Sequence, residues 1–409
     1  MSRFPWVAPR GRVLSWRSAV AAGALVVTGV LIAVQTGGIG PAGTDAGSAR
    51  MLRAGAVSGL GAGSPGGLNA HAHEPGAGSF PPVTVTPSRH AATAAPASSS
   101  APSQRDLPSA SAAGFAPYVD TTEYPPYNLV STARQTGVKQ FNLAFIVSGG
   151  GCTPEWGGTT AIGDNPVAAQ IGALRAIGSD VRISFGGQAG DELALTCATA
   201  ARLEAAYQQV ISGYDVHEVD FDIEGAALAN TAANALRDRA LAALQQQDNL
   251  QISFTVPVIP SGLDSGTVAM LAGAVQAGVR ISAVDIMTMD YGDGAAPDPG
   301  GMMGSYAIAA ATAADAQLAS VLGISDAAAW SRIAVTPMIG VNDITDEVFT
   351  LANARQLEAF AASKHLAWLS MWSAARDTGC SGGAHMAAQP MCSSIAQSPG
   401  AFATALGAY

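Results

Sequence analysis

From Gly114 onward, short runs of β-branched or apolar residues alternate with longer stretches rich in alanine and leucine. This alternation is typical of strand–helix units that build a parallel sheet. The sequence contains eight such runs, at 115–121, 140–147, 181–187, 218–225, 250–257, 284–291, 332–339 and 366–373. The helical stretches between them cover 166–177, 193–211, 231–247, 267–277, 305–322 and 346–362. Eight repeats of this unit predict an α/β fold of the closed (β/α)8 type, the TIM barrel.

Residues 1–35 have the pattern of an export signal. Four arginines (Arg3, Arg10, Arg12 and Arg17) precede an apolar run from Ala19 to Val34, as a basic n-region precedes an h-region. This run is at the short edge of what spans a bilayer, and no clear small-x-small cleavage site follows it. We therefore expect either a signal peptide or an uncleaved signal anchor. The protein would be secreted or extracellular, or held at a membrane through residues 19–34.

Residues 36–112 consist largely of Gly, Ala, Ser, Pro and Thr. Such a segment buries too little apolar surface to offset its ordering entropy, so it is predicted to be a disordered linker. Residues 1–112 hold eight arginines against three acidic residues, a surplus of five positive charges, so the net charge of −10 leaves −15 for residues 113–409. We expect that part to be one monomeric catalytic barrel that does not bind nucleic acid.

All four cysteines lie in the part predicted to fold, at Cys152, Cys197, Cys380 and Cys392. An even number of cysteines in an exported chain favours disulfides. We expect Cys152 to pair with Cys197 and Cys380 with Cys392, because each pair closes a short loop, although sequence alone leaves all three connectivities open. No cysteine or histidine spacing indicates zinc, and we expect neither a metal nor a cofactor.

The fourth predicted strand carries three acidic residues at alternate positions. Period two places Asp220, Asp222 and Glu224 on one face and apolar residues on the other. Burying unpaired charges costs several kcal/mol each, so such a row predicts a function. A rise of about 3.3 Å per residue lets the carboxyls of Asp222 and Glu224 share a proton, which raises one pKa as a general acid requires. The alternative is an edge strand whose acidic face meets water.

Chemistry in a (β/α)8 barrel lies at the C-terminal ends of the strands. Polar and aromatic residues occur at or just after several of these predicted ends. They are Tyr118, Asp120, Ser184, Asp222, Glu224, Asp290, Tyr291, Asn342, Asp343 and Trp372.

Four stretches at these ends carry a family resemblance. Residues 219–225, Val-Asp-Phe-Asp-Ile-Glu-Gly, closely resemble the DxxDxDxE signature of glycoside hydrolase family 18, the chitinases and their relatives, in its actinobacterial and archaeal form. Residues 184–187 resemble the SxGG motif, residues 287–291 stand where the MxYD motif belongs, and Trp372 occupies the position of the strand-eight tryptophan. The resemblance covers about 113–409.

The resemblance implies a reaction in which the substrate supplies its own nucleophile. Glu224 would protonate the glycosidic oxygen. Asp222 would hold the 2-acetamido group so that its carbonyl oxygen attacks the anomeric carbon, and Asp220 would tune the Asp222 proton from below. The implied activity is a retaining hydrolysis of β-1,4-linked N-acetylglucosamine polymers, with chitin or a related oligosaccharide as the partner.

Four residues are predicted to bind the substrate. Trp372 would form an apolar floor beneath the sugar, with barrel packing as the alternative, and Tyr118 would line the same cleft. The tyrosine of MxYD is replaced by Met289. Tyr291 has the parity of Met289, so its hydroxyl could reach inward and support the developing charge. Asp290 would also bind substrate, unless it caps a helix or makes a loop contact.

The signature departs from the family at its first position, where His217 replaces an aspartate. We expect His217 to be a hydrogen-bonded core residue without a catalytic role. Relatives that have lost catalysis bind sugars as lectins or inhibitors and typically lack the final glutamate, which is present here as Glu224. Three alternatives stay open: a weak or inactive glycan-binding protein, an endo-β-N-acetylglucosaminidase, and a lysozyme-like enzyme.

Overall fold

The computed structural model describes residues 104, 114–248 and 250–409, all of which belong to the unit Thr93–Tyr409. The expected export signal, 1–35, and all of the expected linker except Gln104 lie outside the described residues. Gln104 accepts a hydrogen bond from the backbone N–H of Ile281 (3.1 Å). Within the described part of the chain, no helix is both long and apolar enough to cross a membrane.

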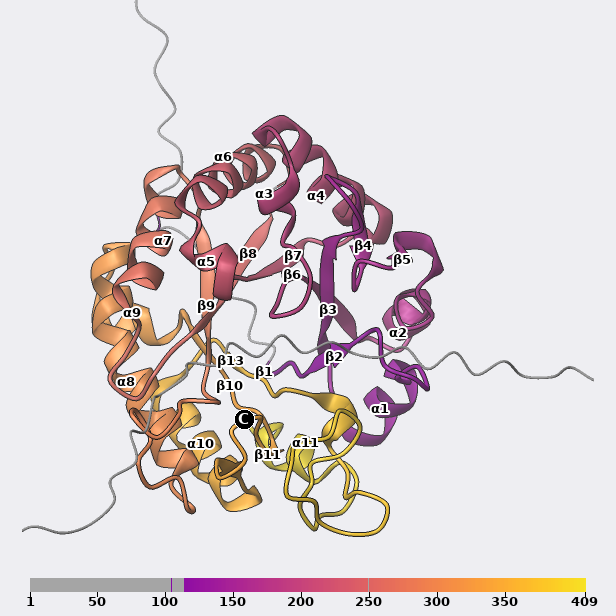
Figure 1. The fold of residues 1–409 in the computed structure, drawn as a ribbon, viewed down its shortest axis with the longest axis vertical. Coiled ribbons are helices and arrows are strands. Elements are labelled where there is room, and N and C mark those ends of the chain that lie inside the picture. Colours follow the sequence, from indigo (N-terminus) through magenta and orange to yellow (C-terminus); the bar gives the residue numbers. More distant parts are fainter. Residues whose placement is uncertain (1–103, 105–113, 249) are drawn as a thin grey trace, which may run out of the picture. The chain divides into compact units, whose positions relative to one another are not determined.

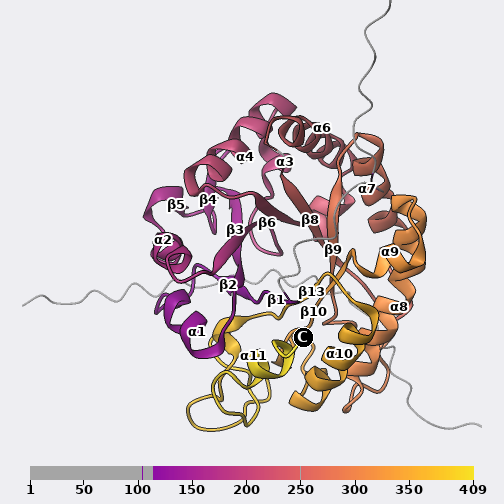
Figure 2. The same ribbon diagram turned by 180° about the vertical axis from the view of Figure 1, so that it is seen from behind.

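Parallel strands close into a barrel, with the helices outside it (Figures 1 and 2). The first strand is interrupted and consists of β1 and β2; it bridges the two ends of the sheet, because β1 pairs with β13 and β2 pairs with β3. In order around the barrel the strands are β1 (Gly114–Phe115) with β2 (Tyr118–Asp120), β3 (Gln140–Ser148), β6 (Asp180–Gly186), β7 (Glu218–Asp222), β8 (Gln251–Pro257), β9 (Ile281–Met287), β10 (Ile333–Thr336) and β13 (Trp368–Leu369). The predicted (β/α)8 barrel is confirmed.

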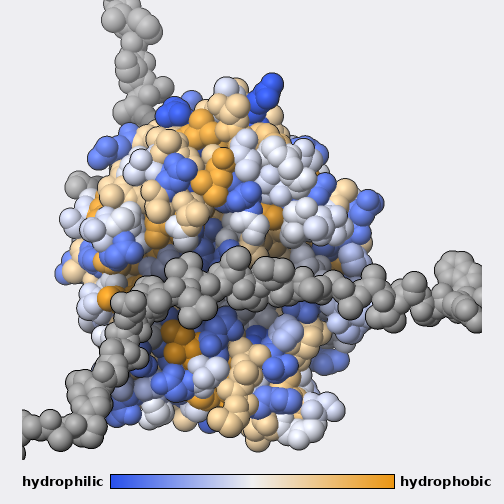
Figure 3. Space-filling view, viewed as in Figure 1, coloured by the Kyte–Doolittle hydropathy of each residue, from blue (hydrophilic) through white to orange (hydrophobic). Residues whose placement is uncertain are grey.

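Helices follow the strands and form the outer layer. They are α1 (Leu129–Thr136), α2 (Ile171–Arg175), α3 (Leu193–Thr196), α4 (Ala200–Tyr214), α5 (Gly225–Ala229), α6 (Thr231–Asp248), α7 (Ser265–Gln276), α8 (Met303–Leu322), α9 (Asp326–Trp330), α10 (Leu351–Lys364) and α11 (Ala401–Leu406). Short strands β4 (Pro154–Trp156) and β5 (Thr160–Ala161) extend the sheet beside β3, and β11 (Gly340–Val341) pairs with β12 (Val348–Phe349). Seen from the side of Figure 1, the described surface is a mosaic of hydrophilic and hydrophobic residues (Figure 3).

Two predicted helices have different limits in the structure because capping residues interrupt them. The stretch 193–211 is broken after α3, where Cys197 is extended, and α4 begins after Thr199, whose side chain accepts a hydrogen bond from the Arg202 N–H. The stretch 346–362 becomes helical only at α10, which Thr350 caps together with Asn353 in a capping box. Residues ahead of this cap form β12 instead.

The barrel has an apolar outside and a polar inside. Between sheet and helices, Phe185 stacks on Phe221 at 5.1 Å, and Tyr207 of α4 packs edge-on against both rings. Inside the barrel, a small apolar cluster of Trp368 and four alanines is buried, but most other inward positions are polar. Interior hydroxyl, carboxyl and guanidinium groups therefore need partners within the barrel.

Both predicted disulfides are present. Cys152 pairs with Cys197, which joins the loop after β3 to the end of α3. Cys380 pairs with Cys392 and closes a loop of the C-terminal segment. The first disulfide constrains two of the loops that follow barrel strands.

Candidate active site

A cavity of about 380 Å³ opens where the barrel strands end. Five of the seven residues predicted to form the site line it: Tyr118, Asp222, Glu224, Asp290 and Trp372. Asp220 lies deeper on the same strand as Asp222 and is fully buried. Tyr291 does not line this cavity.

Asp220 is held by hydroxyl groups from the two adjacent strands, β6 and β8, and from β2. Its carboxylate accepts hydrogen bonds from Tyr118 (3.0 Å), Ser184 (2.6 Å), Ser253 (2.7 Å) and Thr255 (3.0 Å). Ser184 and Ser253 are its direct register partners on β6 and β8. The strand register thus surrounds the buried Asp220 side chain with hydroxyl donors.

Asp222 has the opposite environment, although it is only two residues further along β7. Its side chain is 4% exposed, and its Oδ1 atom has no hydrogen-bond partner. Burial, followed by the charges of Glu224 and Asp220, raises its pKa well above the ordinary value. Burial thus disfavours the ionised form of Asp222, and one of its oxygens has no partner and is free to bind a ligand.

Gly186 allows β6 to approach Asp222 closely. Its φ is 98°, and a Cβ atom at this position would lie 2.1 Å from the backbone oxygen of Asp222. The adjacent Gly187 donates a backbone hydrogen bond to the same oxygen (3.0 Å). Any side chain at residue 186 would push the two strands apart and displace Asp222.

Glu224 follows the end of β7 and immediately precedes α5. The backbone between it and Asp222 is fixed by the N–H of Ile223, which donates to the Thr255 carbonyl (2.9 Å). Burial, and then the charge of Asp290, raises the pKa of Glu224. A carboxyl that lines a cavity and retains its proton toward neutral pH can act as a general acid.

Three aromatic rings form one side of the cavity, which we call the aromatic wall: Tyr118, Phe145 and Trp372. Phe145 and Trp372 are stacked, with ring centroids 5.7 Å apart and planes at 19°, and Tyr118 lies 6.2 Å from each ring. Sequence reasoning missed Phe145. Gly187 makes room for it, since a Cβ atom there would lie 2.7 Å from the Phe145 ring. This apolar wall suits the C–H face of a sugar ring.

Asp290 both lines the cavity and makes a loop contact. It has a left-handed backbone conformation (φ 50°), and its Oδ1 accepts a hydrogen bond from the backbone N–H of Ile344 (2.9 Å). Burial raises its pKa. The contact with Ile344 fixes Asp290 in the cavity wall, and its charge acts on Glu224.

The inward orientation predicted for Tyr291 is wrong. Strand β9 ends at Met287, and the left-handed residue Asp290 breaks the alternation on which the prediction depended. The Tyr291 ring packs edge-on against Tyr306 of α8, with centroids 6.2 Å apart, and its N–H donates to Glu347 (3.0 Å). Met287 and Met289 occupy the cavity wall instead.

His217 is also placed differently from the expectation. It is exposed and lies just before β7, so it is not a core residue and is remote from the polar interior. The substitution at the first signature position therefore leaves the environments of Asp220 and Asp222 unaltered by any contact from His217.

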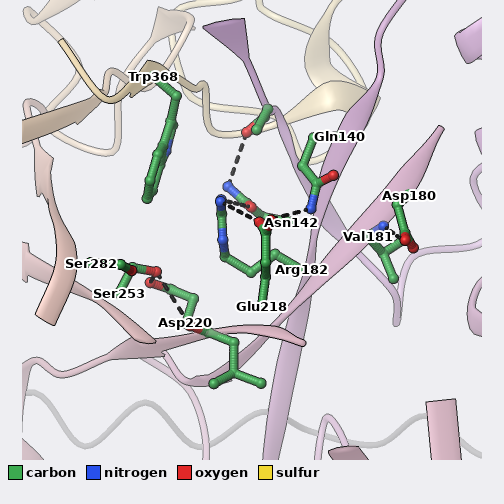
Figure 4. A network of polar contacts seen from close by, with 12 residues as sticks. Gln140, Asn142, Asp180, Val181, Arg182, Glu218, Asp220, Ser253, Ser282 and Trp368 are labelled. Carbon is green, nitrogen blue, oxygen red and sulfur yellow. Dashed lines mark hydrogen bonds and ion pairs between the residues drawn. The ribbon is translucent and has the colours of Figure 1, made fainter. Parts of the chain in front are cut away.

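Two buried charged residues inside the barrel were missed, Arg182 and Asp285. Arg182 donates to Asn142 (2.8 Å) and Glu218 (2.9 Å), and its guanidinium lies 4.0 Å from the centre of the Trp368 ring (Figure 4). We call Arg182, Glu218, Asn142 and Trp368 the barrel floor. Asp285 accepts hydrogen bonds from Thr336 (2.8 Å) and from Trp368 Nε1 (3.2 Å).

A sequence signal for both residues existed. Arg182 has the strand parity of Ser184, and Asp285 has that of Met287 and Met289, so the alternation used for the fourth strand would have placed them inward. Over the residues that the structure describes, no group of three His, Cys, Asp or Glu side chains is placed to hold a metal ion.

Comparison with known proteins gives relatives by sequence and by structure. No protein-family model matches the chain. It is 34% identical over 275 residues to a probable bifunctional chitinase/lysozyme of Escherichia coli, a match that covers 64% of this chain and 31% of that protein. It is equally identical over 275 residues to endochitinase 11 of Metarhizium anisopliae, covering 64% of this chain and 52% of that protein. The chain thus spans about a third to a half of the length of these relatives.

A solved structure matches over nearly its whole length. The catalytic domain of a hyperthermophilic chitinase from Pyrococcus furiosus is 31% identical, with a TM-score of 0.65, and the match covers 73% of this chain and 96% of that structure. Catalytic-site mutants of that domain have also been solved in complex with chito-oligosaccharides and match equally well. By sequence identity and by shared fold, the chain belongs to the chitinase family, glycoside hydrolase family 18.

Proposed function

We propose that this protein is a retaining chitinase that hydrolyses β-1,4-linked N-acetylglucosamine polymers by substrate-assisted catalysis. The observation that carries the proposal is the pair Asp222 and Glu224. Both have raised pKa values and both line one cavity, and one oxygen of Asp222 has no partner. The Pyrococcus furiosus relative, solved with chito-oligosaccharides, supports this substrate class.

In the proposed reaction, Asp222 holds the 2-acetamido group of the bound sugar through its N–H. The acetamido carbonyl oxygen attacks the anomeric carbon while Glu224 gives its proton to the leaving glycosidic oxygen, so the C–O bond breaks as the ring closes. Glu224, now ionised, takes a proton from water, and the resulting hydroxyl opens the cyclic intermediate. The anomeric configuration is retained, because two displacements occur at the same carbon.

The remaining contacts serve binding and charge control. The aromatic wall is proposed to pack against the sugar at the cleavage point. Asp220 is fixed beneath Asp222 by hydrogen bonds from four hydroxyl groups. Asp290 is proposed to bind substrate from the opposite side, while its charge helps to keep Glu224 protonated.

The test is hydrolysis of N-acetylglucosamine oligomers by the full chain, with the anomeric form of the first products followed by NMR. We expect the β-anomer first, and no products from the Glu224→Gln variant. Initial α-anomer would contradict the substrate-assisted route. Tight binding of the oligomers without cleavage by the wild type would instead make the protein a glycan-binding member of the family.

A second substrate deserves the same assay, since the Escherichia coli relative is described as a chitinase and a lysozyme. Purified bacterial cell wall should be offered in parallel with chitin oligomers, and release of soluble fragments measured. Cleavage of cell wall alone would assign a lysozyme-like function to the same site.

We also propose that the protein is exported. The basic segment and apolar run of residues 1–35 support this, and so do the two disulfides, which persist in oxidising compartments. Fractionation of cells, with the N-terminus of the product determined by mass spectrometry, separates a secreted form from a membrane-anchored one. Recovery of the chain in the cytosol with four free thiols would refute the proposal.

A further inference from the structure

We propose that Asp285 is a positioning residue of the active site, whose negative charge inside the barrel helps Asp222 to keep its proton and so sets the alkaline limit of catalysis. The inference rests on the proposed function, because this limit is measured through hydrolysis. Asp285 does not line the cavity, so it acts on the reaction only through other carboxyls.

The strand register brings Asp285 near the reacting pair. Asp285 on β9 is the register partner of Thr255 on β8, and Thr255 is in turn the partner of Asp222 on β7. The Asp285 side chain is fully buried and is fixed by Thr336 and Trp368. Its carboxyl thus has a single defined place in the barrel interior, two strands from Asp222.

Few positively charged groups lie close enough to Asp285 to offset its negative charge. Strands β8, β10 and β13 turn only hydroxyl groups and the Trp368 indole toward it among the described contacts. The titratable or charged groups that interact with it electrostatically are Asp220 and Asp222 from β7, Tyr118 from β2 and Arg182 from β6. Arg182 is already paired with Glu218. The neighbouring carboxyls therefore have the larger electrostatic effect on Asp285.

Asp285 changes its charge near neutral pH. Burial, followed by the charge of Asp220, raises its pKa to about 7, although Thr336, Trp368 and Arg182 act in the opposite direction. Below that pH Asp285 is neutral and has little influence. Above it, the new negative charge opposes ionisation of Asp222, whose pKa it raises. Asp222 then keeps its proton to higher pH.

The kinetic test compares the pH dependence of kcat for wild type and Asp285→Asn on N-acetylglucosamine oligomers. Asparagine keeps the shape and can still accept from Trp368, but it carries no charge. We expect the alkaline limb to move toward acid by about half to one pH unit, with the acid limb and KM unchanged. An unchanged profile, or an equal loss at every pH, would overturn the proposal.

A thermal test gives the same answer without activity. The raised pKa means that ionisation of Asp285 destabilises the folded state, so wild type should lose Tm relative to Asp285→Asn between about pH 4 and pH 7, and the difference should then stay constant. A difference in Tm between the two proteins that does not change with pH would show that Asp285 does not titrate in this range, and would overturn the proposal. If wild type cleaves no oligomer at all, the proposed function fails, and the thermal result still decides whether Asp285 titrates.

Two further variants complete the design. Asp238→Asn is the matched control, since Asp238 is a buried carboxyl on α6 whose pKa burial raises to about 6, yet it does not line the cavity; its kinetic profile should match wild type. Trp368→Phe removes one hydrogen bond to Asp285 and should keep Asp285 neutral to higher pH, so the alkaline limb should again move toward acid. This variant carries the test if Asp285→Asn does not fold, and an unmoved limb would count against the proposal.

Discussion

The two ends of the barrel interior differ in whether their buried charged groups have partners. At the barrel floor, Arg182 has Glu218 and Asn142 as partners and stacks on Trp368, so its charge is satisfied. At the cavity end, Asp222 has an oxygen without a partner, and the charge of Asp290 raises the pKa of Glu224 further. Equal burial therefore says little about role. The satisfied groups stabilise the fold, and the unsatisfied groups are available for chemistry.

The same difference exists within one strand. Asp220 accepts hydrogen bonds from four hydroxyl groups, whereas Asp222, two residues later, is raised in pKa and lacks a partner at Oδ1. Substitutions of the paired groups should therefore mainly lower the free energy of unfolding, and substitutions of the unpaired groups should mainly lower activity.

The largest effect is expected for Glu224→Gln. The amide keeps the shape of the side chain but cannot donate the proton, so kcat should fall by about 10³-fold or more. Calorimetric titration with an N-acetylglucosamine oligomer should show nearly unchanged affinity. A parallel loss of affinity would mean that Glu224 is needed for binding or for the fold of the loop.

At the floor, Arg182→Met should cost about 3 kcal/mol in the free energy of unfolding, because it leaves the Glu218 carboxylate without its partner. Chemical denaturation measures this. The comparison variant is Asp180→Asn, which removes the charge of the partly exposed ion pair between Arg175 and Asp180 and should cost below about 1 kcal/mol. Equal losses of unfolding free energy in the two variants would show that the ion pair at the barrel floor stabilises the fold no more than the one near the surface.

Asp222→Asn should lower kcat by about 10²-fold through poorer orientation of the acetamido group. The binding affinity for the oligomer should change less than the rate does. A rate within a few fold of wild type would exclude the substrate-assisted role of Asp222.

The smallest expected effects are opposite changes in stability when Asp222 and Asp220 are each replaced by asparagine. Asp222 has a raised pKa in the folded state, so its contribution to stability is present at low pH and is lost as pH rises. Asp222→Asn should therefore be more stable than wild type at pH 8 and similar to it near pH 4. Asp220→Asn should instead lose about 1–2 kcal/mol at pH 8, because charge-assisted hydrogen bonds weaken. Denaturation at both pH values measures the pair, and effects of the same sign would contradict the contrast.

Alternation along the strands predicted the barrel and the deepest part of the site, because each side chain there is fixed by strand parity. It failed where the regular backbone ends. Tyr291 lies beyond β9, past a residue with positive φ, so parity no longer determines its direction. Phe145 could not be recognised from the pattern, since its role depends on Gly187, which follows another strand, β6. Asp285 had the right parity but stood alone in an apolar run.

Helix limits failed for a related reason. The apolar pattern of 193–211 continues through Cys197, whereas the chain is diverted there by its disulfide with Cys152 and restarted by the Thr199 cap. Periodicity reports which residues could be helical, but a local cap or a cross-link decides where a helix stops.

The aromatic wall joins the two ends of the folded chain. Tyr118 comes from the first barrel strand, Phe145 from the second, and Trp372 follows the last. A chain synthesised only as far as α9 would already contain Asp222 and Glu224, but it would lack one of the two stacked rings and the strand that closes the barrel. The proposed hydrolysis should therefore begin only when the last strand has docked against the first, so that catalytic activity reports the completion of folding.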